Sequence, residues 1–211
     1  MPTTAPRANV FLTFDDGPDP DWTPRVLDLL AAANARAAFF VIGQQARRHA
    51  DLLRSVAAAG HVIGNHTYSH RHPWTMRSRA ARDEVRRGAE TIEDVTGVAV
   101  KLYRAPHGRL RRCMRIEAER GGQRPVHWTV SAIDWGPLGT ASRIASRLES
   151  VTADDVVLMH DGRNQHNRPD QLTQVLPQFL ADLRRRGIEP VACPAVVTEE
   201  ADWPQKNTKG A

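Results

Sequence analysis

Val10-Phe-Leu-Thr-Phe-Asp-Asp-Gly-Pro18 is the stretch of this 211-residue sequence that indicates the fold most clearly. Its first five residues are mostly β-branched, aromatic or apolar, which is typical of a buried strand, and the Asp-Asp-Gly-Pro that follows is a turn signal. Thr23 and Pro24 are typical of a helix N-cap and a first helical residue. The next apolar residues recur at helical spacing: Val26, Leu29, Leu30 and Ala33. The stretch therefore predicts a strand, a polar turn and a helix in succession.

The same alternation of strand and helix continues along the chain. Further strands are expected at residues 37–42, 61–65, 101–104, 125–130, 156–159 and 189–193. Helices are expected from about Leu52 to Gly60 and at residues 78–96, 111–120, 140–150 and 170–186. Because about seven strands alternate with helices, the chain is predicted to form an α/β fold with a parallel sheet.

Polar side chains at the strand ends help to choose between two kinds of parallel sheet. They occur after most of the expected strands: Asp15, Asp16, His66, His70, Arg104, Asp134 and His160. A barrel enzyme builds its site from the carboxyl ends of many strands, whereas an open doubly wound sheet concentrates it near one switch point. The pattern therefore predicts a distorted or incomplete (β/α) barrel with about seven parallel strands and an active site at the strand C-terminal ends.

Length and composition indicate one sizeable domain. The chain is 41% hydrophobic and 25% charged, which is ordinary for a globular protein, and its length is short for two domains. No apolar run is long enough to cross a bilayer, so membrane insertion is not expected. Residues 1–8 lack the pattern of a signal peptide, which predicts a cytoplasmic protein, although a secreted protein without its leader would look the same.

The net charge of +5 comes mainly from arginines that are spread through the expected helices, for example at Arg47-Arg48, Arg86-Arg87 and Arg184–Arg186. No aromatic residues alternate with them in a way that would stack bases, so a solvated basic surface is favoured and nucleic-acid binding is not expected. Cys113 and Cys193 are far apart and form no CxxC pair, which favours two reduced structural thiols.

Two motifs contain the residue types of a metal-dependent hydrolase, although each is common on its own. Asp15 and Asp16 are adjacent, and because side chains alternate along a strand, only one of them points inward unless the turn redirects the other. The pair suits a plain turn equally well. His66 and His70 are four residues apart and can converge on one cation. With one carboxylate they make three ligands, which leaves positions open for water and a substrate carbonyl. His72 is interpreted as a rim residue.

Other candidates have an ordinary structural explanation when they are taken singly. Arg104 resembles a surface arginine, His160 a buried histidine with a satisfied partner, and Trp135 a core residue. Only their joint placement at strand ends favours a site. The remaining histidines interpreted as structural or surface residues are His49, His61 and His166.

Five motifs occur in order, each at a strand end: Thr13-Phe-Asp-Asp-Gly17, His66-Thr-Tyr-Ser-His70, Arg104-Ala-Pro-His-Gly108, Asp134-Trp135 and Leu158-Met-His160. Over residues 9–197 the sequence resembles the polysaccharide deacetylase family, also called carbohydrate esterase family 4 or the NodB homology domain. The phrase at residues 126–130 and the segment around Asp170-Gln171 resemble the small nodulation-type chitooligosaccharide deacetylases. Residues 198–211 are polar and are expected to form a flexible tail.

The resemblance implies a metal site and a base. Asp16, His66 and His70 would hold one divalent ion, commonly zinc in the family, although cobalt or nickel can serve. Asp15 would be the general base on the water that the ion activates. Arg104 would pair with Asp15, keeping it ionised and correctly oriented.

It also implies an acid and a substrate groove. His160 would protonate the leaving amine, and Asp134 would hold it as an imidazolium ion. The main-chain N–H of His107 would stabilise the oxyanion together with the metal. The remaining residues expected at the substrate are Trp135, Pro106, Trp22 and Trp74.

The sequence departs from the family pattern at two positions. Ser131 stands where the family usually has an aspartate, three residues before Asp134, which puts in doubt how that loop is supported. His107 stands where the family often has a tyrosine. A main-chain oxyanion donor tolerates that change, but a titratable ring in the cleft is expected to alter specificity.

The function implied is hydrolysis of N-acetyl groups from oligosaccharides or glycoconjugates that contain N-acetylglucosamine. Its pH profile would be bell-shaped, with Asp15 ionised on the low side and His160 protonated on the high side. One alternative is a deacylase that releases acetyl or formyl groups from a small amino-sugar metabolite. Another is a catalytically silent, carbohydrate-binding relative. The expected partner is an N-acylated amino sugar, and nothing in the sequence identifies a protein partner.

Overall fold

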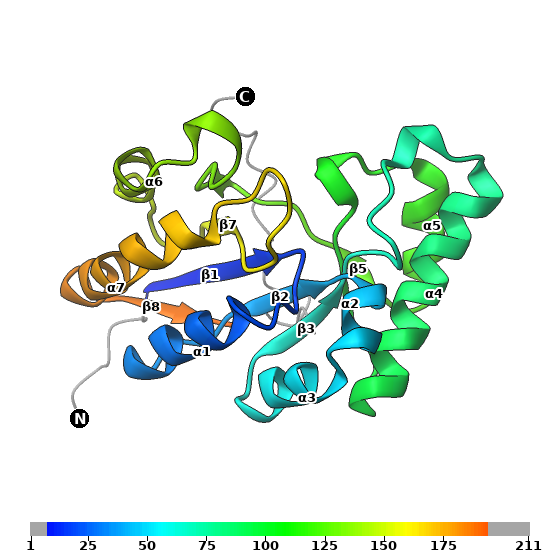
Figure 1. The fold of residues 1–211 in the computed structure, drawn as a ribbon, viewed down its shortest axis with the longest axis horizontal. Coiled ribbons are helices and arrows are strands. Elements are labelled where there is room, and N and C mark those ends of the chain that lie inside the picture. The colour runs from blue at the N-terminus through cyan, green and yellow to red at the C-terminus, as the bar shows by residue number, and fades with distance from the viewer. Residues whose placement is uncertain (1–7, 194–211) are drawn as a thin grey trace, which may run out of the picture.

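The computed structural model describes residues 8–193, which form a curled parallel sheet surrounded by helices (Figure 1). The strands are β1 (Ala8–Asp15), β2 (Ala38–Val41), β3 (Val62–Asn65), β4 (Leu102–Tyr103), β5 (Arg124–Pro125), β6 (Val130–Ser131), β7 (Val156–His160) and β8 (Ile188–Val191). Their order is β5-β4-β3-β2-β1-β7-β6, with β8 paired to the first half of β1, and every pairing is parallel. In this register Asp15 lies beside His160, so β1 and β7 end at the same edge of the sheet.

The strand expected at residues 125–130 is two short strands instead of one. β5 pairs with β4, whereas β6 pairs with β7 at the opposite end of the strand order. Between them, the N–H of Val126 donates to Tyr103 and the N–H of Thr129 donates to Val156. One segment therefore joins both ends of the sheet and cannot pair with one neighbour along its whole length. If β5 and β6 are counted as one strand, the sheet has seven parallel strands and forms a distorted barrel. The predicted fold class is therefore confirmed.

The helices are α1 (Thr23–Ala32), α2 (Gly43–Arg48), α3 (Ala50–Ala58), α4 (Ser78–Thr96), α5 (Arg112–Arg120), α6 (Ala141–Leu148) and α7 (Pro169–Arg185). Three short 3-10 segments accompany them: η1 (Pro73–Thr75), η2 (Pro106–Gly108) and η3 (Gly136–Leu138). The N-cap prediction was wrong by one residue, because α1 begins at Thr23 and Trp22 precedes it. The hydroxyl of Thr23 donates to Asp161. Helix α2 was not predicted.

The core lies between the sheet and the outer helices. In Figure 1, α6 and α7 lie towards the end of the sheet with β8, and α4 and α5 lie towards the end with β3. Strand β2 is buried along its whole length, and the rings of Phe14 and Phe39 stack with centroids 5.2 Å apart. Such a ring pair contributes about 1 kcal/mol beyond its burial. Among the described helices, none is long and apolar enough to cross a membrane.

Candidate active site

A cleft of about 300 Å³ opens at the carboxyl ends of β1, β3 and β7. Its lining includes seven of the residues that the sequence predicted at the site: Asp15, Asp16, His66, His70, His107, Trp135 and His160. Arg104 and Asp134 lie behind this lining, and each is hydrogen-bonded to one of its residues. The structure therefore brings the predicted catalytic and metal-ligating residues together.

The turn after β1 directs both aspartates into the cleft. Asp15 is the last residue of the strand, and Asp16 has a φ of 74°, in the left-handed region that aspartate enters more readily than most residues. As a result, Nε2 of His66 lies 3.7 Å from Oδ2 of Asp15 and 3.4 Å from Oδ1 of Asp16. The left-handed backbone at Asp16 therefore turns its side chain to the same side as that of Asp15, which regular strand alternation would not do.

This turn packs tightly against the residues that follow β7. A Cβ added to Gly17 would lie 2.3 Å from Oδ2 of Asp161, so the position has room only for glycine. The N–H groups of Asp161 and Gly162 both lie within hydrogen-bond distance of the Asp15 carbonyl, at 3.2 and 3.3 Å. Burial raises the pKa of Asp161 to about 7, and the hydrogen bond from Thr23 opposes this rise in part. The turn is thus held by main-chain contacts as well as by its own sequence.

The rings of His66 and His70 point their Nε2 atoms at the same carboxylate. Nδ1 of His66 donates to the Arg104 carbonyl at 2.8 Å, which fixes the ring and leaves Nε2 facing the cleft. Nε2 of His70 lies 3.1 Å from Oδ1 of Asp16. One ligand atom from each of Asp16, His66 and His70 lies within 4.8 Å of the other two, so these residues can hold one metal ion.

Helix α4 supports the loop that carries the two histidines. Thr67 and His70 have φ values of 68° and 56°, so the loop is an irregular turn and not a helix. The buried carboxylate of Glu84 accepts hydrogen bonds from the N–H of Ser69 at 2.8 Å and from its hydroxyl at 2.7 Å. A Cβ added to Gly88 would lie 2.8 Å from the carbonyl carbon of Thr67. Close packing against α4 therefore fixes the position of His70.

The two oxygens of Asp16 have different surroundings. Oδ2 accepts hydrogen bonds from Asn167 at 2.7 Å and from Asn164 at 3.1 Å. Oδ1 is buried and has no hydrogen-bond partner among residues 8–193. Burial disfavours the ionised form, but His66 and His70 outweigh it and hold the pKa of Asp16 well below its ordinary value. A buried carboxylate oxygen that faces two imidazole nitrogens fits a divalent cation.

Arg104 places a fixed positive charge beside Asp15. Its side chain is 1% exposed, and its guanidinium donates to Oδ1 of Asp15 at 2.7 Å and to the Thr13 hydroxyl at 2.8 Å. Other donors of the same group reach the carbonyls of Val126 and His127. A buried guanidinium is stable only when it is paired and hydrogen-bonded, and these contacts provide both. The network leaves Oδ2 of Asp15 directed towards the cleft.

His160 and Asp134 form a complete hydrogen-bonded pair. Nδ1 of His160 donates to Oδ1 of the buried Asp134 at 2.8 Å, and the main-chain N–H of His160 donates to Oδ2 at 2.8 Å. Burial alone would lower the pKa of His160, but Asp134 outweighs it, with help from Asp16 and Asp15, and the pKa rises to about 9. The imidazole is therefore protonated near neutral pH, and its Nε2 is the nitrogen left to face the cleft.

His107 lies in η2 with a φ of 56°, and its ring centroid is 4.7 Å from that of His70. Burial, followed by the charge of His70, lowers the pKa of His107 to about 4, so its ring is neutral near pH 7. A Cβ added to the next residue, Gly108, would lie 2.7 Å from the Trp128 ring, which is why glycine is needed there. Pro106 is buried and does not line the cleft.

Ser131 takes part in supporting the loop that leads to Asp134. Its hydroxyl accepts a hydrogen bond from the N–H of Ile133 at 3.2 Å, and Ile133 has a φ of 47°. A β-branched residue rarely adopts this backbone conformation, so the turn relies on such local contacts. The serine therefore provides a hydrogen-bond acceptor at the position where the family usually has an aspartate.

Trp22 and Trp74 do not line the cleft, although the sequence predicted both as groove walls. Trp22 packs under the guanidinium groups of Arg25 and Arg163, 4.6 and 5.6 Å from its ring centre. Trp74 is 65% exposed in η1. The guanidinium of Arg111 lies 5.5 Å from the centre of the Trp74 ring, so each of these two rings contacts an arginine outside the cleft lining. Their contact with substrate stays a prediction.

The cleft also contains residues that the sequence interpretation missed: Trp128, Leu158, Asn164, His166 and Asn167. Asn164, His166 and Asn167 follow β7 directly, so their position after a strand was a usable signal. Asparagine is also common in ordinary turns, so the sequence alone did not identify Asn164 and Asn167 as site residues. His166, which the sequence predicts to be a structural or surface residue, also lines the cleft. Trp128 is in the phrase that carried the closer family resemblance.

Relatives of known type match most of the chain. The sequence model described as polysaccharide deacetylase matches residues 3–126. The chain is 33% identical over 190 residues to a chitooligosaccharide deacetylase of Bradyrhizobium sp., covering 86% of this chain and 87% of that protein. It is 31% identical over 192 residues to a peptidoglycan-N-acetylglucosamine deacetylase of Bacillus cereus, and the match covers 90% of this chain and 68% of that protein. A family 4 carbohydrate esterase from Streptomyces lividans, solved in complex with acetate, matches with a TM-score of 0.78 and 28% identity, covering 86% of this chain and 91% of that chain.

Proposed function

The chain belongs to the polysaccharide deacetylase family of carbohydrate deacetylases, and from this premise we propose that it removes N-acetyl groups from N-acetylglucosamine-containing oligosaccharides or glycoconjugates with the help of a divalent ion. One observation carries the proposal: a three-residue cation site, an arginine-bound carboxylate and an aspartate-bound histidine share one cleft. Each of these groups corresponds to one requirement of amide hydrolysis, namely an activated water, a base and an acid.

Asp16, His66 and His70 would hold the ion. The fit rests on the buried Oδ1 of Asp16, which lacks a hydrogen-bond partner among the described residues and faces both imidazoles. Nitrogen and carboxylate ligands of this kind suit zinc first, and cobalt or nickel as alternatives. When bound, the ion supplies positive charge that acidifies a water molecule and polarises the amide carbonyl.

Asp15 is the residue placed to accept a proton from the attacking water. Its Oδ1 is occupied by Arg104, and its Oδ2 lies on the side of the His66 ring, towards the cleft. The guanidinium donates a hydrogen bond to this side chain, and a general base must be in the carboxylate form to accept a proton. Because Arg104 is anchored by other hydrogen bonds, it also limits the rotation of Asp15.

His160 is the residue placed to give a proton to the leaving amine. Asp134 binds its Nδ1, so Nε2 carries the proton that can reach the substrate. With a pKa of about 9, the ring remains a cation up to about that pH, whereas an ordinary carboxyl group is already ionised above about pH 4. A separate acid and base on different strands of the same cleft match the proposed reaction.

The substrate would lie between the ligand cluster and the indole rings of the cleft. Trp135 and Trp128 both line the cleft, and their flat apolar faces suit the faces of a sugar ring. The main-chain N–H of His107 would stabilise the oxyanion, as the resemblance implies. The neutral His107 ring adds a hydrogen-bonding edge at the rim of the cleft.

Product analysis tests the proposal. Zinc-reconstituted protein is incubated with a panel of acetylated and formylated amino sugars, from single sugars to chitooligosaccharides, and the products are identified by mass spectrometry. Acetate release from the oligosaccharides is expected, and it should be abolished by chelation and by Asp15→Asn. Release that persists at full rate in either case would contradict the mechanism. Acyl release from single sugars alone would favour the small-metabolite alternative.

A further inference from the structure

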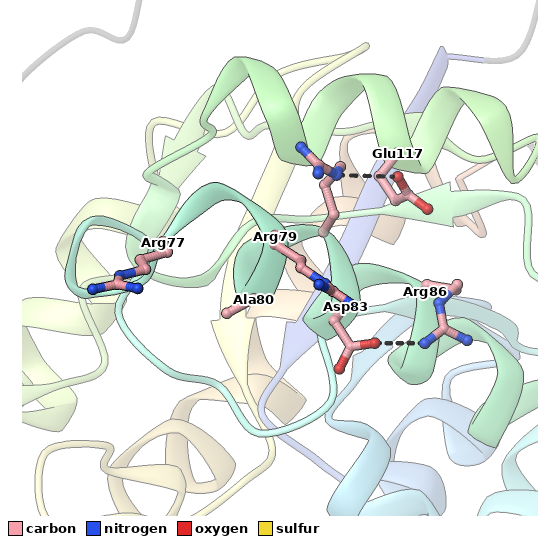
Figure 2. A pocket seen from close by; sticks show the side chains of 7 residues that line it. Arg77, Arg79, Ala80, Asp83, Arg86 and Glu117 are labelled. Carbon is pink, nitrogen blue, oxygen red and sulfur yellow. Dashed lines mark hydrogen bonds and ion pairs between the residues drawn. The ribbon is translucent and has the colours of Figure 1, made fainter.

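Helices α4 and α5 pack together and present an arginine-rich surface to solvent. A hollow of about 640 Å³ lies over them, with Arg77, Arg79, Arg82 and Arg86 in its lining (Figure 2). A second hollow of about 520 Å³ adjoins it and shares Arg82. The two hollows therefore form one continuous surface, which we call the α4–α5 surface.

Part of the charge on this surface has no carboxylate partner. Arg82 pairs with Glu117 at 4.0 Å. Arg86 pairs with Asp83 at 2.5 Å, and Figure 2 shows this pair. Four other exposed arginines that line the hollows make no ion pair with any residue of the described chain: Arg77, Arg79, Arg112 and Arg120. Their guanidinium groups remain available to bind carboxylates or phosphates in a bidentate manner.

Trp74 gives the surface an aromatic face. It is 65% exposed and lines the second hollow, with the guanidinium of Arg111 5.5 Å from its ring centre. Arg111 donates to the carbonyls of Pro73 and Met76 at 2.8 and 2.6 Å, so the segment that carries Trp74 is tied to the start of α5. An exposed indole on an anchored segment provides a flat apolar platform with little ordering cost.

A chain of side-chain contacts links the cleft to the segment that carries Trp74. The ring of His72 stacks on that of His107, with centroids 5.1 Å apart, and His107 in turn contacts the ring of the ligand His70. Nδ1 of His72 also accepts a hydrogen bond from the N–H of Trp74. A polymer bound with one sugar in the cleft can therefore extend over Trp74 and towards the arginines.

We infer that the α4–α5 surface binds a polysaccharide that carries carboxylate groups, with Trp74 against a sugar ring and Arg77, Arg79, Arg112 and Arg120 on the acids. This inference rests on the proposed function, because it describes the substrate of the same enzyme as an acidic glycan. A single exposed indole suits a sugar better than a run of nucleotide bases, which needs a series of stacking rings. A membrane surface would need further apolar side chains beside the arginines, and the other large exposed ones, Val98 and Leu138, do not line the hollows.

The test compares binding of two matched ligands to two matched variants. One ligand is a hyaluronan octasaccharide, in which glucuronate alternates with N-acetylglucosamine, and the other is the neutral chitin hexasaccharide. The surface variant is R77Q/R79Q/R112Q/R120Q. The control variant R47Q/R48Q/R143Q/R184Q removes the same charge from exposed arginines that line neither the cleft nor the α4–α5 surface. Titration calorimetry at about 50 mM and about 300 mM sodium chloride gives the salt dependence.

The surface variant should bind the acidic octasaccharide about tenfold more weakly than wild type at low salt and should lose most of the salt dependence. The control variant should bind it as wild type does, and affinity for the neutral hexasaccharide should be unchanged in both. Trp74→Ala should weaken binding of the acidic ligand with all four arginines present. Equal losses in the surface and control variants, or no binding of the octasaccharide by wild type, would overturn the inference.

Two further measurements separate this inference from its rivals and from the proposed function. Single-stranded DNA and phosphatidylglycerol vesicles are titrated in parallel. The glycan assignment would be overturned if wild type binds either of them more tightly than the acidic glycan and only the surface variant loses that binding. Acetate release from the neutral hexasaccharide should be equal in wild type and the surface variant. If no protein releases acetate but the binding differences remain, the proposed function fails while the acidic-glycan surface stands.

Discussion

The two sides of the cleft differ in whether their polar groups are satisfied without a ligand. On the β1–β3 side, Oδ1 of Asp16 faces two imidazoles and has no hydrogen-bond partner among residues 8–193. On the β7 side, both oxygens of Asp134 are hydrogen-bonded to His160. The first side has an acceptor atom that a cation would satisfy, whereas the polar groups of the second side are satisfied without a ligand. We therefore expect ion binding and proton transfer to be separable by mutation.

Asp16→Asn should produce the largest effect. It removes the one charged ligand of the proposed ion, so zinc affinity should fall by about 100-fold or more and acetate release should become undetectable. Competition with a chromophoric chelator measures the affinity. Asp134→Asn is the matched control on the other side of the cleft, and its zinc affinity should equal that of wild type. If the Asp16→Asn protein binds zinc as tightly as wild type, the β1–β3 side of the cleft is not the ion-binding side.

Asp134→Asn should instead change the pH dependence of catalysis. Asp134, with help from Asp16 and Asp15, raises the pKa of His160 to about 9, so the proposed acid stays protonated until the pH rises to about that value. Without the negative charge the acid is lost at lower pH, and the high-pH limb of kcat should move down. At saturating zinc, kcat should also fall by about 100-fold or more. A high-pH limb that stays in place would show that this pair does not supply the acid.

Asn167→Ala tests the support of the ion side. Asn167 donates to Oδ2 of Asp16 at 2.7 Å and thereby leaves Oδ1 as the oxygen that faces the histidines. Losing it should weaken zinc binding by about tenfold, because residues that orient a ligand affect affinity on this scale. Asn164→Ala, whose contact is longer at 3.1 Å, should have a smaller effect. The reverse order of the two variants in calorimetry would argue against this role for Oδ2.

Asp161→Asn should have the smallest effect, and it concerns stability. Burial raises the pKa of Asp161 to about 7 in the folded protein, above that of an exposed carboxyl group. The stability from this group is therefore present at low pH and is lost as the pH rises through about 7. The variant should lack this loss and exceed wild type by about 1 kcal/mol or more at high pH. Urea unfolding of metal-free protein on both sides of this range measures it, and parallel pH dependences would contradict it.

The sequence predicted most of the fold because local pattern and tertiary packing agree. Helix α4 spans Ser78–Thr96, the range that its apolar spacing indicates, because the same residues face the core. The strand at residues 125–130 was less predictable. Its β-rich composition is consistent with pairing, but which neighbour it pairs with depends on how the sheet closes, and in the structure its two ends pair with different strands.

The sequence could predict those site residues that lie at the ends of neighbouring parallel strands. Asp15 and His160 lie side by side because their parallel strands end together. Side-chain direction in loops was not predictable, since it depends on φ values such as the 74° of Asp16 and on contacts between distant segments. The same limit explains why Trp22 and Trp74 lie outside the cleft lining and why Trp128 was missed.

Zinc titration of chelator-stripped protein, with acetate release measured by mass spectrometry in the same samples, tests the central claim most directly. The chitin hexasaccharide serves as substrate, and Asp16→Asn is run in parallel. The account predicts that acetate release rises with added zinc, saturates at one ion per chain, and is absent in the variant at the same zinc concentrations. Full release without metal, or the same zinc-dependent release by Asp16→Asn, would contradict it.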